Sequence, residues 1–288
     1  MAGSKVLEPK VFVEGLAMGE SPRWHHGWLW YADWGTHEIA NLDIEGQREV
    51  FGKVDSLPIS FDWLPDERLV VVAGREARLK VQAIATGALQ DWVDLSPISP
   101  KPWNEIVVDG RGNAYVNGIG FDFPAEPPST GQIALVTPDG SPRLVAEGLQ
   151  FPNGMAITPD NTTLIVAESY GECLTSFDIL PDGTLDNRAI WAKTPGDHPD
   201  GICLDAEGAV WYGDVGTGRC VRVKQGGQKL QEIKLDRGCF ACTLGGDDRN
   251  MLYMVAADYS DPRALMSGKS RTGRILAIEA PAPGAGWP

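Results

Sequence analysis

Four polar side chains that carry oxygen donors stand at nearly the same position in four similar stretches of the sequence. They are Glu20, Asn104, Asn153 and Asp200. Each lies 9 to 11 residues before a short apolar segment, and these segments begin at Leu29, Ala114, Leu164 and Val210. A recurrence of this kind predicts that the four side chains come from equivalent places in a repeated structural unit.

Two carboxylates and two carboxamides form a set of hard oxygen donors, which suits a divalent cation. Glu20 and Asp200 would repel each other if they packed together without a neutralising charge. Three or four protein ligands leave positions open for water and substrate, as in a catalytic metal site. The alternative is that these residues cap turns, as single Asn and Asp residues often do. Their common register favours the metal site.

The elements that must position these residues recur as apolar segments separated by tight turns. The second strand of each predicted unit starts 40 to 50 residues after the previous one: Leu29–Ala32, Leu69–Val72, Ala114–Val116, Leu164–Ala167, Val210–Tyr212 and Leu252–Val255. A third strand follows each of them: Glu38–Asp43, Leu79–Ile84, Gln132–Val136, Leu174–Ile179, Cys220–Val223 and Arg274–Ile278. A fourth strand follows in the first five units, and the turns between strands are rich in Gly and Asp.

Six units of four strands predict an all-β fold, a six-bladed β-propeller formed by residues 1–288 as a single domain. The sixth unit lacks its own fourth strand, and we expect the N-terminal strand Lys10–Val13 to complete it. This closure by the termini leaves no long open sheet edge. Because the first strand of each blade lines the central channel, the four polar residues should form a ring at one mouth. The long loops Asp122–Thr130 and Asp258–Thr272 are expected at the rim.

Composition limits the classes of partner and compartment. With 25 basic and 39 acidic residues, the net charge of −14 argues against binding to nucleic acid or to anionic membranes. No stretch approaches the roughly 18 apolar residues of a membrane span, and no secretory signal is visible. The chain has 5 cysteines, an odd number, and its single C-x-x-C pair, Cys239 and Cys242, lies outside any βαβ pattern. We expect free, buried thiols in a cytoplasmic protein.

Several motifs resemble those of the SMP-30/gluconolactonase/LRE family of regucalcin-like lactonases. They are Gly19-Glu20-Ser21-Pro22-Arg23-Trp24, Pro152-Asn153-Gly154, and Pro199-Asp200-Gly201 with the segment from Leu204 to Gly208. The resemblance implies a six-bladed propeller and one divalent metal ion held by Glu20, Asn153 and Asp200. It also implies that Asp200 transfers a proton and that Asn104 contacts the substrate. The identity of the ion stays open among Ca, Zn, Mn, Mg and Fe(II).

The sequence departs from the family pattern near Asn104. Members that act on sugar lactones carry Arg two residues before this Asn, whereas this chain has Pro102 there, followed by Trp103. We predict that Trp103 forms an apolar pocket wall and that Asp122, near a substrate-binding Glu of the family, also contacts the substrate. The loss of a guanidinium, which can hold several hydroxyls, predicts a less polar lactone. His198 is either a secondary proton carrier beside Asp200 or an ordinary loop residue.

These observations favour a metal-dependent hydrolase of cyclic esters, acting on a small-molecule lactone. The lactone carbonyl would be polarised by the ion, while Asp200 accepts a proton from the attacking water. One alternative is a non-enzymatic propeller that binds Ca²⁺ or another protein. Another is a metal-free enzyme of the strictosidine-synthase type, which would not need Glu20 together with Asn153 and Asp200. No G-x-S-x-G motif supports a serine hydrolase.

Overall fold

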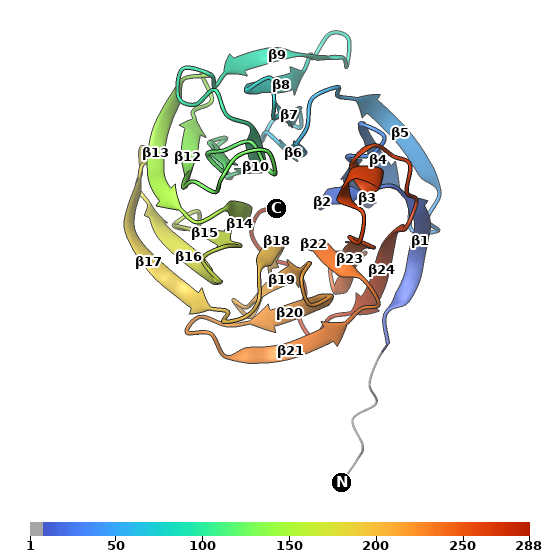
Figure 1. Cartoon of the computed structure of the whole chain (residues 1–288). Coiled ribbons are helices and arrows are strands. Elements are labelled where there is room, and N and C mark those ends of the chain that lie inside the picture. Colours follow the sequence, from blue (N-terminus) through green and yellow to red (C-terminus); the bar gives the residue numbers. More distant parts are fainter. Residues whose placement is uncertain (1–7) are drawn as a thin grey trace.

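In the computed structural model, which describes residues 8–288, six antiparallel sheets of four strands each are arranged in a ring (Figure 1). In five sheets the strands follow one another in chain order from the first, innermost strand to the last, outermost one. The predicted six-bladed propeller is therefore confirmed. We number the blades 1 to 6 in chain order.

The bounds of the strands follow the repeat read from the sequence. Blades 1 to 3 contain β2 (Gly19–His25), β3 (Trp28–Asp33), β4 (Glu38–Leu42), β5 (Arg48–Lys53), β6 (Ile59–Trp63), β7 (Leu69–Ala73), β8 (Arg78–Gln82), β9 (Leu89–Asp94), β10 (Trp103–Val108), β11 (Ala114–Gly118), β12 (Gly131–Val136) and β13 (Pro142–Leu149). Blades 4 to 6 contain β14 (Pro152–Ile157), β15 (Thr163–Glu168), β16 (Cys173–Ile179), β17 (Leu185–Lys193), β18 (Pro199–Leu204), β19 (Val210–Asp214), β20 (Arg219–Val223), β21 (Lys229–Lys234), β22 (Gly238–Gly245), β23 (Met251–Ala257) and β24 (Gly273–Glu279).

The N-terminal strand closes the ring as predicted. β1 (Lys10–Leu16) pairs antiparallel with β24, with Lys10 opposite Ala277 and Leu16 opposite Gly273. It is therefore the outer strand of blade 6, and it extends three residues beyond the predicted end at Val13. Because the first and last segments of the chain share one sheet, opening the ring would require breaking this ladder.

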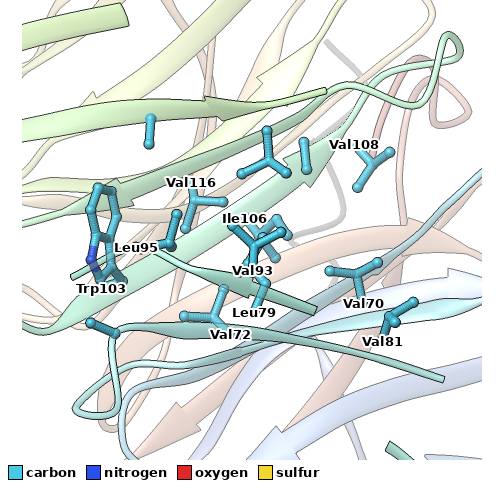
Figure 2. Close-up of a cluster of buried hydrophobic side chains, with 14 of the residues drawn as sticks. Val70, Val72, Leu79, Val81, Val93, Leu95, Trp103, Ile106, Val108 and Val116 are labelled. Carbon is cyan, nitrogen blue, oxygen red and sulfur yellow. The ribbon is translucent and has the colours of Figure 1, made fainter. Parts of the chain in front are cut away.

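The apolar core lies between the faces of neighbouring blades. Every residue of the inner strand β10 is buried, whereas the outer strand β13 is exposed along most of its length. Figure 2 shows the cluster between blades 2 and 3, where valine and leucine side chains from β7, β8 and β9 meet Ile106 and Val116 of blade 3. Stacking of this kind lets each sheet bury both faces against its neighbours.

Trp103 belongs to this cluster, which corrects its predicted role. Its side chain is fully buried among the apolar residues of blades 2 and 3 (Figure 2), and its indole Nε1 donates to the carbonyl oxygen of Ser99 at 3.2 Å. Consecutive strand residues point to opposite faces, so the side chain beside Asn104 turns into the blade core. Trp103 is therefore a core residue and does not form a wall of the channel.

The C-terminal segment crosses the ring at the end of the channel away from the four polar residues. The backbone N–H of Gly284 donates to Arg249 of blade 6 at 2.8 Å, and that of Ala206 in blade 5 donates to Pro283 at 2.7 Å. Trp287 pairs with Ile157 of blade 4, and the chain ends near the ring centre (Figure 1). No contact of this segment was predicted from the sequence.

In the part of the chain that the structure describes, helical structure is limited to one short element. Helix α1 (Pro262–Met266) lies in the long loop between β23 and β24, and the side chain of Asp261 caps its N-terminus. Leu265 anchors it against Met18 and Phe240 in a small apolar cluster. Within residues 8–288, no helix has the length and apolar character needed to cross a membrane.

Candidate active site

The four polar residues predicted to form a ring lie at equivalent irregularities of the inner strands. Register shifts between Glu20 and Arg23, Trp103 and Ile106, Pro152 and Met155, and Pro199 and Ile202 each insert one extra residue opposite the neighbouring strand. A β-bulge re-aims the side chains around it. The inner strand of blade 2, β6, pairs without a shift and carries no ring residue. The common register read from the sequence therefore reflects a common backbone geometry.

Two glycines next to ring residues allow the inner strands to converge. A Cβ atom at Gly154, which follows Asn153, would lie 2.5 Å from the backbone nitrogen of Ile202 and 2.6 Å from the carbonyl oxygen of Asp200. A Cβ at Gly201 would lie 2.3 Å from the Cβ of Ala241 in blade 6. No side chain fits into these gaps, which explains why Gly follows the polar residue in both the Pro-Asn-Gly and the Pro-Asp-Gly motif.

Gly154→Ala and Gly201→Ala are therefore expected to destabilise the protein by about 2 kcal/mol or more, within the range for overpacking a rigid core. The matched control is Gly52→Ala in the outer strand β5, where nothing lies within 4 Å of the added Cβ. That change should be neutral or slightly stabilising. Urea denaturation midpoints of the three variants test this expectation. Equal midpoints for Gly154→Ala and Gly52→Ala would show that the inner strands can separate at little cost.

The two carboxylates of the ring lie in an environment that disfavours their charged forms. Glu20 is 5% exposed, and burial, followed by the nearby charge of Glu105, raises its pKa to about 8. Burial likewise raises the pKa of Asp200 well above its ordinary value, and Glu20, Glu105 and Asp214 raise it further. Asp200 nevertheless keeps part of its surface open at the channel mouth. The two predicted carboxylates therefore lie close enough for the charge of one to raise the pKa of the other.

Few hydrogen bonds stabilise the charged forms of these two carboxylates. Glu20 accepts one bond, from the backbone N–H of Ser21 at 3.1 Å. Within residues 8–288, no protein donor lies within hydrogen-bonding distance of the Asp200 carboxylate, whereas the buried Asp33 accepts bonds from Ala17 and Met18. A buried carboxylate without donors is costly unless a cation or a proton neutralises it.

The two amides of the ring are joined to each other. Nδ2 of Asn104 donates to Oδ1 of Asn153 at 3.3 Å, and Nδ2 of Asn153 donates to Oγ of Ser169 at 3.4 Å. Ser169 in turn donates to the carbonyl oxygen of Pro199, next to Asp200, at 2.8 Å. This series of contacts connects blades 3, 4 and 5 across the mouth. It fixes the orientation of Asn153, the amide predicted to be a ligand.

A buried ion pair at the same mouth was not predicted from the sequence. Nη2 of Arg23 lies 3.4 Å from Oε2 of Glu105, and both side chains are almost fully buried. Oγ of Ser21 donates to Oε1 of Glu105 at 2.6 Å, and Arg23 also donates to the carbonyl oxygen of Ile106 at 3.0 Å. The pair ties blade 1 to blade 3 beneath Glu20. Its only signal was a charged residue inside the apolar segment that follows Asn104.

A further buried carboxylate comes from blade 2. Burial raises the pKa of Asp62 to about 6, although the nearby Arg23 guanidinium lowers it, as do backbone N–H donors from Val108 and Trp63. Its bond to Val108 at 2.7 Å joins blades 2 and 3. A small cavity lined by Ser21, Arg23 and Glu105 lies among these groups in the channel. The channel therefore holds more buried charge than the ring alone.

Comparison with known proteins agrees with this architecture. The family model described as SMP-30/Gluconolactonase/LRE-like region matches residues 18–258. The chain belongs to this family. It is 29% identical to regucalcin of Danio rerio over 264 residues, 86% of this chain and 85% of the relative. It is 28% identical to L-arabinolactonase of Azospirillum brasilense over 241 residues, 77% of each chain. The solved structure of a calcium-binding regucalcin from Agrobacterium tumefaciens superposes with a TM-score of 0.77 at 19% identity, covering 96% of this chain and 95% of the other.

Two predicted residues of this SMP-30-like propeller lie toward the outside of the mouth. The Asp122 carboxylate is 3.4 Å from Arg75 and 3.5 Å from Lys101, so its charge is already paired by two exposed cations. His198 is exposed, and its backbone N–H donates to Asp214 at 3.4 Å. Asp122 thus contacts cations of neighbouring loops, whereas His198 contacts the buried Asp214, whose charge also raises the pKa of Asp200.

Aromatic side chains from blades 3, 4 and 6 gather in loops next to the inner strands of this SMP-30-like propeller. Phe151, directly before Pro152, packs against Tyr170 with ring centroids 4.5 Å apart. Phe121 and Phe123 each lie 5.8 Å from Phe151. These four residues come from the loops of blades 3 and 4.

Two more aromatic residues lie on the blade 6 side. Phe240 sits at the register shift of β22, the equivalent of the ring positions, and packs 5.5 Å from Tyr259. Burial raises the pKa of Tyr259, and Asp200 and Tyr170 raise it further, so Tyr259 lies near both. We call the set Phe121, Phe123, Phe151, Tyr170, Phe240 and Tyr259 the aromatic rim.

All five cysteines are free and buried, as the sequence predicted. Sγ of Cys203 lies 3.9 Å from Sγ of Cys242 in the core between blades 5 and 6. Cys239 and Cys242 thus belong to an apolar cluster, and burial raises the pKa of the Cys242 thiol well above its ordinary value. A thiol in this environment is a poor nucleophile.

Proposed function

We propose that this protein is a lactonase that depends on a divalent metal ion. The observation that carries the proposal is the pair of buried carboxylates, Glu20 and Asp200, which meet at bulges of two different blades with almost no protein donors. Relatives named as lactonases, among them L-arabinolactonase, support the reaction class. The proposal places the enzyme in the cytoplasm, where its free thiols would stay reduced.

The donor set fits a divalent cation. Glu20 and Asp200 offer hard anionic oxygens, Asn153 offers a neutral one, and the carboxylates need a positive charge to ionise where they lie. We assign these three residues as ligands. The bound ion would supply Lewis-acid polarisation of the lactone carbonyl and electrostatic stabilisation of the developing oxyanion.

The chain itself supplies proton transfer and orientation. Asp200 is the ring carboxylate that keeps some open surface at the mouth, so we assign its Oδ atoms to accept the proton of the attacking water. The free amide oxygen of Asn104 stands beside Asn153 and would orient the substrate. The pair Arg23–Glu105 holds the backbone beneath Glu20 in place. Asp122 remains a proposed substrate contact, although it would first have to leave Arg75 and Lys101.

The second candidate is a propeller that binds Ca²⁺ without catalysis. The name of the calcium-binding regucalcin structure motivates it, and the same ring would serve as its site. Turnover separates the two candidates, because only an enzyme hydrolyses lactones at a rate proportional to protein concentration. A metal-free enzyme of the strictosidine-synthase type would keep its activity after exhaustive chelation. The experiment is therefore a panel of γ- and δ-lactones assayed with Ca²⁺, Zn²⁺, Mn²⁺, Mg²⁺ or Fe²⁺, each with and without chelator.

We expect this panel to show a preference for aliphatic or aromatic lactones over gluconolactone, by about 10- to 200-fold in kcat/KM. Three members of the aromatic rim, Phe123, Tyr170 and Tyr259, present exposed apolar surface, and Tyr170 is 46% exposed. Pro102 offers no side-chain donor for sugar hydroxyls.

Pro102→Arg should narrow this preference by improving the polar substrate. The matched control is Pro100→Arg, which adds the same charge on the exposed surface two residues upstream. A wild-type preference for gluconolactone, with no relative gain from Pro102→Arg, would contradict the assignment of an apolar pocket.

A further inference from the structure

Two histidines and a glutamate meet at the end of the channel away from the ring. His25 is the last residue of β2, His26 follows it in the β2–β3 turn, and Glu67 lies in the β6–β7 turn of the neighbouring blade. Nε2 of His25 is 3.0 Å and Nε2 of His26 is 2.7 Å from the same carboxylate oxygen, Oε2 of Glu67. One potential ligand atom from each residue lies within 4.8 Å of the others. None of these residues takes part in the proposed reaction.

We propose that these three side chains form a second metal site, which binds a first-row transition-metal ion such as Zn²⁺. Imidazole nitrogens favour Zn²⁺, Cu²⁺ and Ni²⁺, whereas Ca²⁺ and Mg²⁺ prefer oxygen donors alone. In tetrahedral geometry, ligand bonds of about 2.0–2.1 Å place neighbouring ligand atoms about 3.3 Å apart. The distances of 2.7 and 3.0 Å between the imidazole nitrogens and Oε2 of Glu67 would therefore need to increase only slightly for an ion to bind between these atoms.

Local structure holds the ligands in this arrangement. The His25 ring stacks on Trp63 of blade 2, with ring centroids 3.9 Å apart and planes 8° from parallel. His26 and Glu67 have φ angles of 49° and 68°, the left-handed region that non-glycine residues rarely adopt. In blades 3 and 5, glycine takes the left-handed position of the corresponding turn, as Gly112 and Gly208. A glutamate at this position adopts a backbone conformation that is unfavourable for a residue with a Cβ atom. In return, its carboxylate lies next to the two imidazoles.

The site would join blade 1 to blade 2, because its ligands come from turns of both. Three protein ligands leave a fourth tetrahedral position for water. Glu67 and His26 are 60% and 70% exposed in their side chains, so an ion can reach them from solvent. This mixed nitrogen and oxygen set differs in chemistry from the oxygen ring at the other mouth, which allows the two sites to be occupied by different ions.

Zn²⁺ titration calorimetry on the full-length protein, with Ca²⁺ at saturating concentration throughout, tests this assignment. The variants are His26→Gln and Glu67→Gln, both at exposed positions where the fold should tolerate the change. The matched control is His37→Gln, which removes an imidazole from another loop, where its Nδ1 lies 3.3 Å from the carbonyl oxygen of Val54. Any displacement of Ca²⁺ by Zn²⁺ from the oxygen ring would contribute equally to all four proteins.

We expect wild type and His37→Gln to bind one more equivalent of Zn²⁺ than His26→Gln and Glu67→Gln, or to bind it at least about 100-fold more tightly. Loss of even an outer-shell partner of a metal ligand lowers metal affinity about 10- to 100-fold, and these two variants lose a ligand itself. Zn²⁺ should also raise the Tm of the first two proteins more than that of the other two. Equal stoichiometry, affinity and Tm response in all four proteins would overturn the proposal.

Discussion

Asp200→Asn is expected to lower kcat/KM for lactone hydrolysis by at least about 100-fold, the lower end of the range for losing a general base. The amide has nearly the shape of the carboxylate but cannot accept the proton of the attacking water. The substitution also removes the negative charge of Asp200 from the ring, where it interacts with the charge of Glu20. Steady-state kinetics at saturating metal concentration measure the effect.

Metal binding must be measured on the same variant so that the two roles of Asp200 are separated. A variant that still binds the ion and has lost turnover would assign Asp200 to proton transfer, whereas loss of both would assign it to the ion as well. Asp186→Asn is the matched control, because Asp186 is exposed on the outer strand β17 and its carboxylate accepts from the backbone N–H of the next residue, Asn187, at 2.8 Å. Turnover of Asp200→Asn within a few-fold of wild type would contradict its catalytic role.

The parts of the structure that depend on periodicity were predictable from the sequence. Alternating apolar strands and turns at a repeat of 40 to 50 residues specified six blades, and the spare strand near Lys10 specified the closure. The four ring residues could be placed because each stands 9 to 11 residues before a second strand. These features are local or repeated, so one sequence contains several independent copies of the signal.

The parts that depend on irregular backbone were not predictable. Strict alternation would turn Glu105 away from the side that Asn104 faces, but the bulge between Trp103 and Ile106 adds one residue and brings both into the channel. No residue type marks that bulge. Alternation did carry information that the prediction of Trp103 as a pocket wall ignored, since its neighbour Asn104 faces the channel.

Contacts between distant segments were also beyond the sequence. Aromatic side chains join loops of blades 3 and 4, and nothing in the separate stretches around Phe121 and Phe151 shows that they meet. The contacts of the C-terminal segment with Arg249 and Ile157 also join residues that are far apart in the sequence. Such contacts follow from ring closure, which fixes the separation of loops only after all six blades are in place.

Metal-free protein is expected to lose stability as the pH rises from about 5 to 8, and added divalent metal should restore it. Burial raises the pKa of Glu20 from 4.5 to about 8 in the folded protein. Between these values the folded chain keeps a proton that the unfolded chain releases, so the free energy of unfolding falls with increasing pH. At about 1.4 kcal/mol per pKa unit, Glu20 alone would account for at most about 5 kcal/mol. Asp200, whose pKa is also raised, acts in the same direction.

Metal should oppose this loss because it favours the ionised carboxylates and binds only the folded site. At 100 times its dissociation constant, a ligand of this kind adds about 2.7 kcal/mol. The measurement is urea denaturation of chelator-treated wild type and Glu20→Gln at several pH values between 5 and 8, with and without added Ca²⁺ or Zn²⁺. Glu20→Gln removes the group that titrates, so its metal-free stability should fall less with pH and respond less to metal. Wild type and Glu20→Gln with the same pH slope and the same metal response would contradict the assignment of Glu20 as a buried metal ligand.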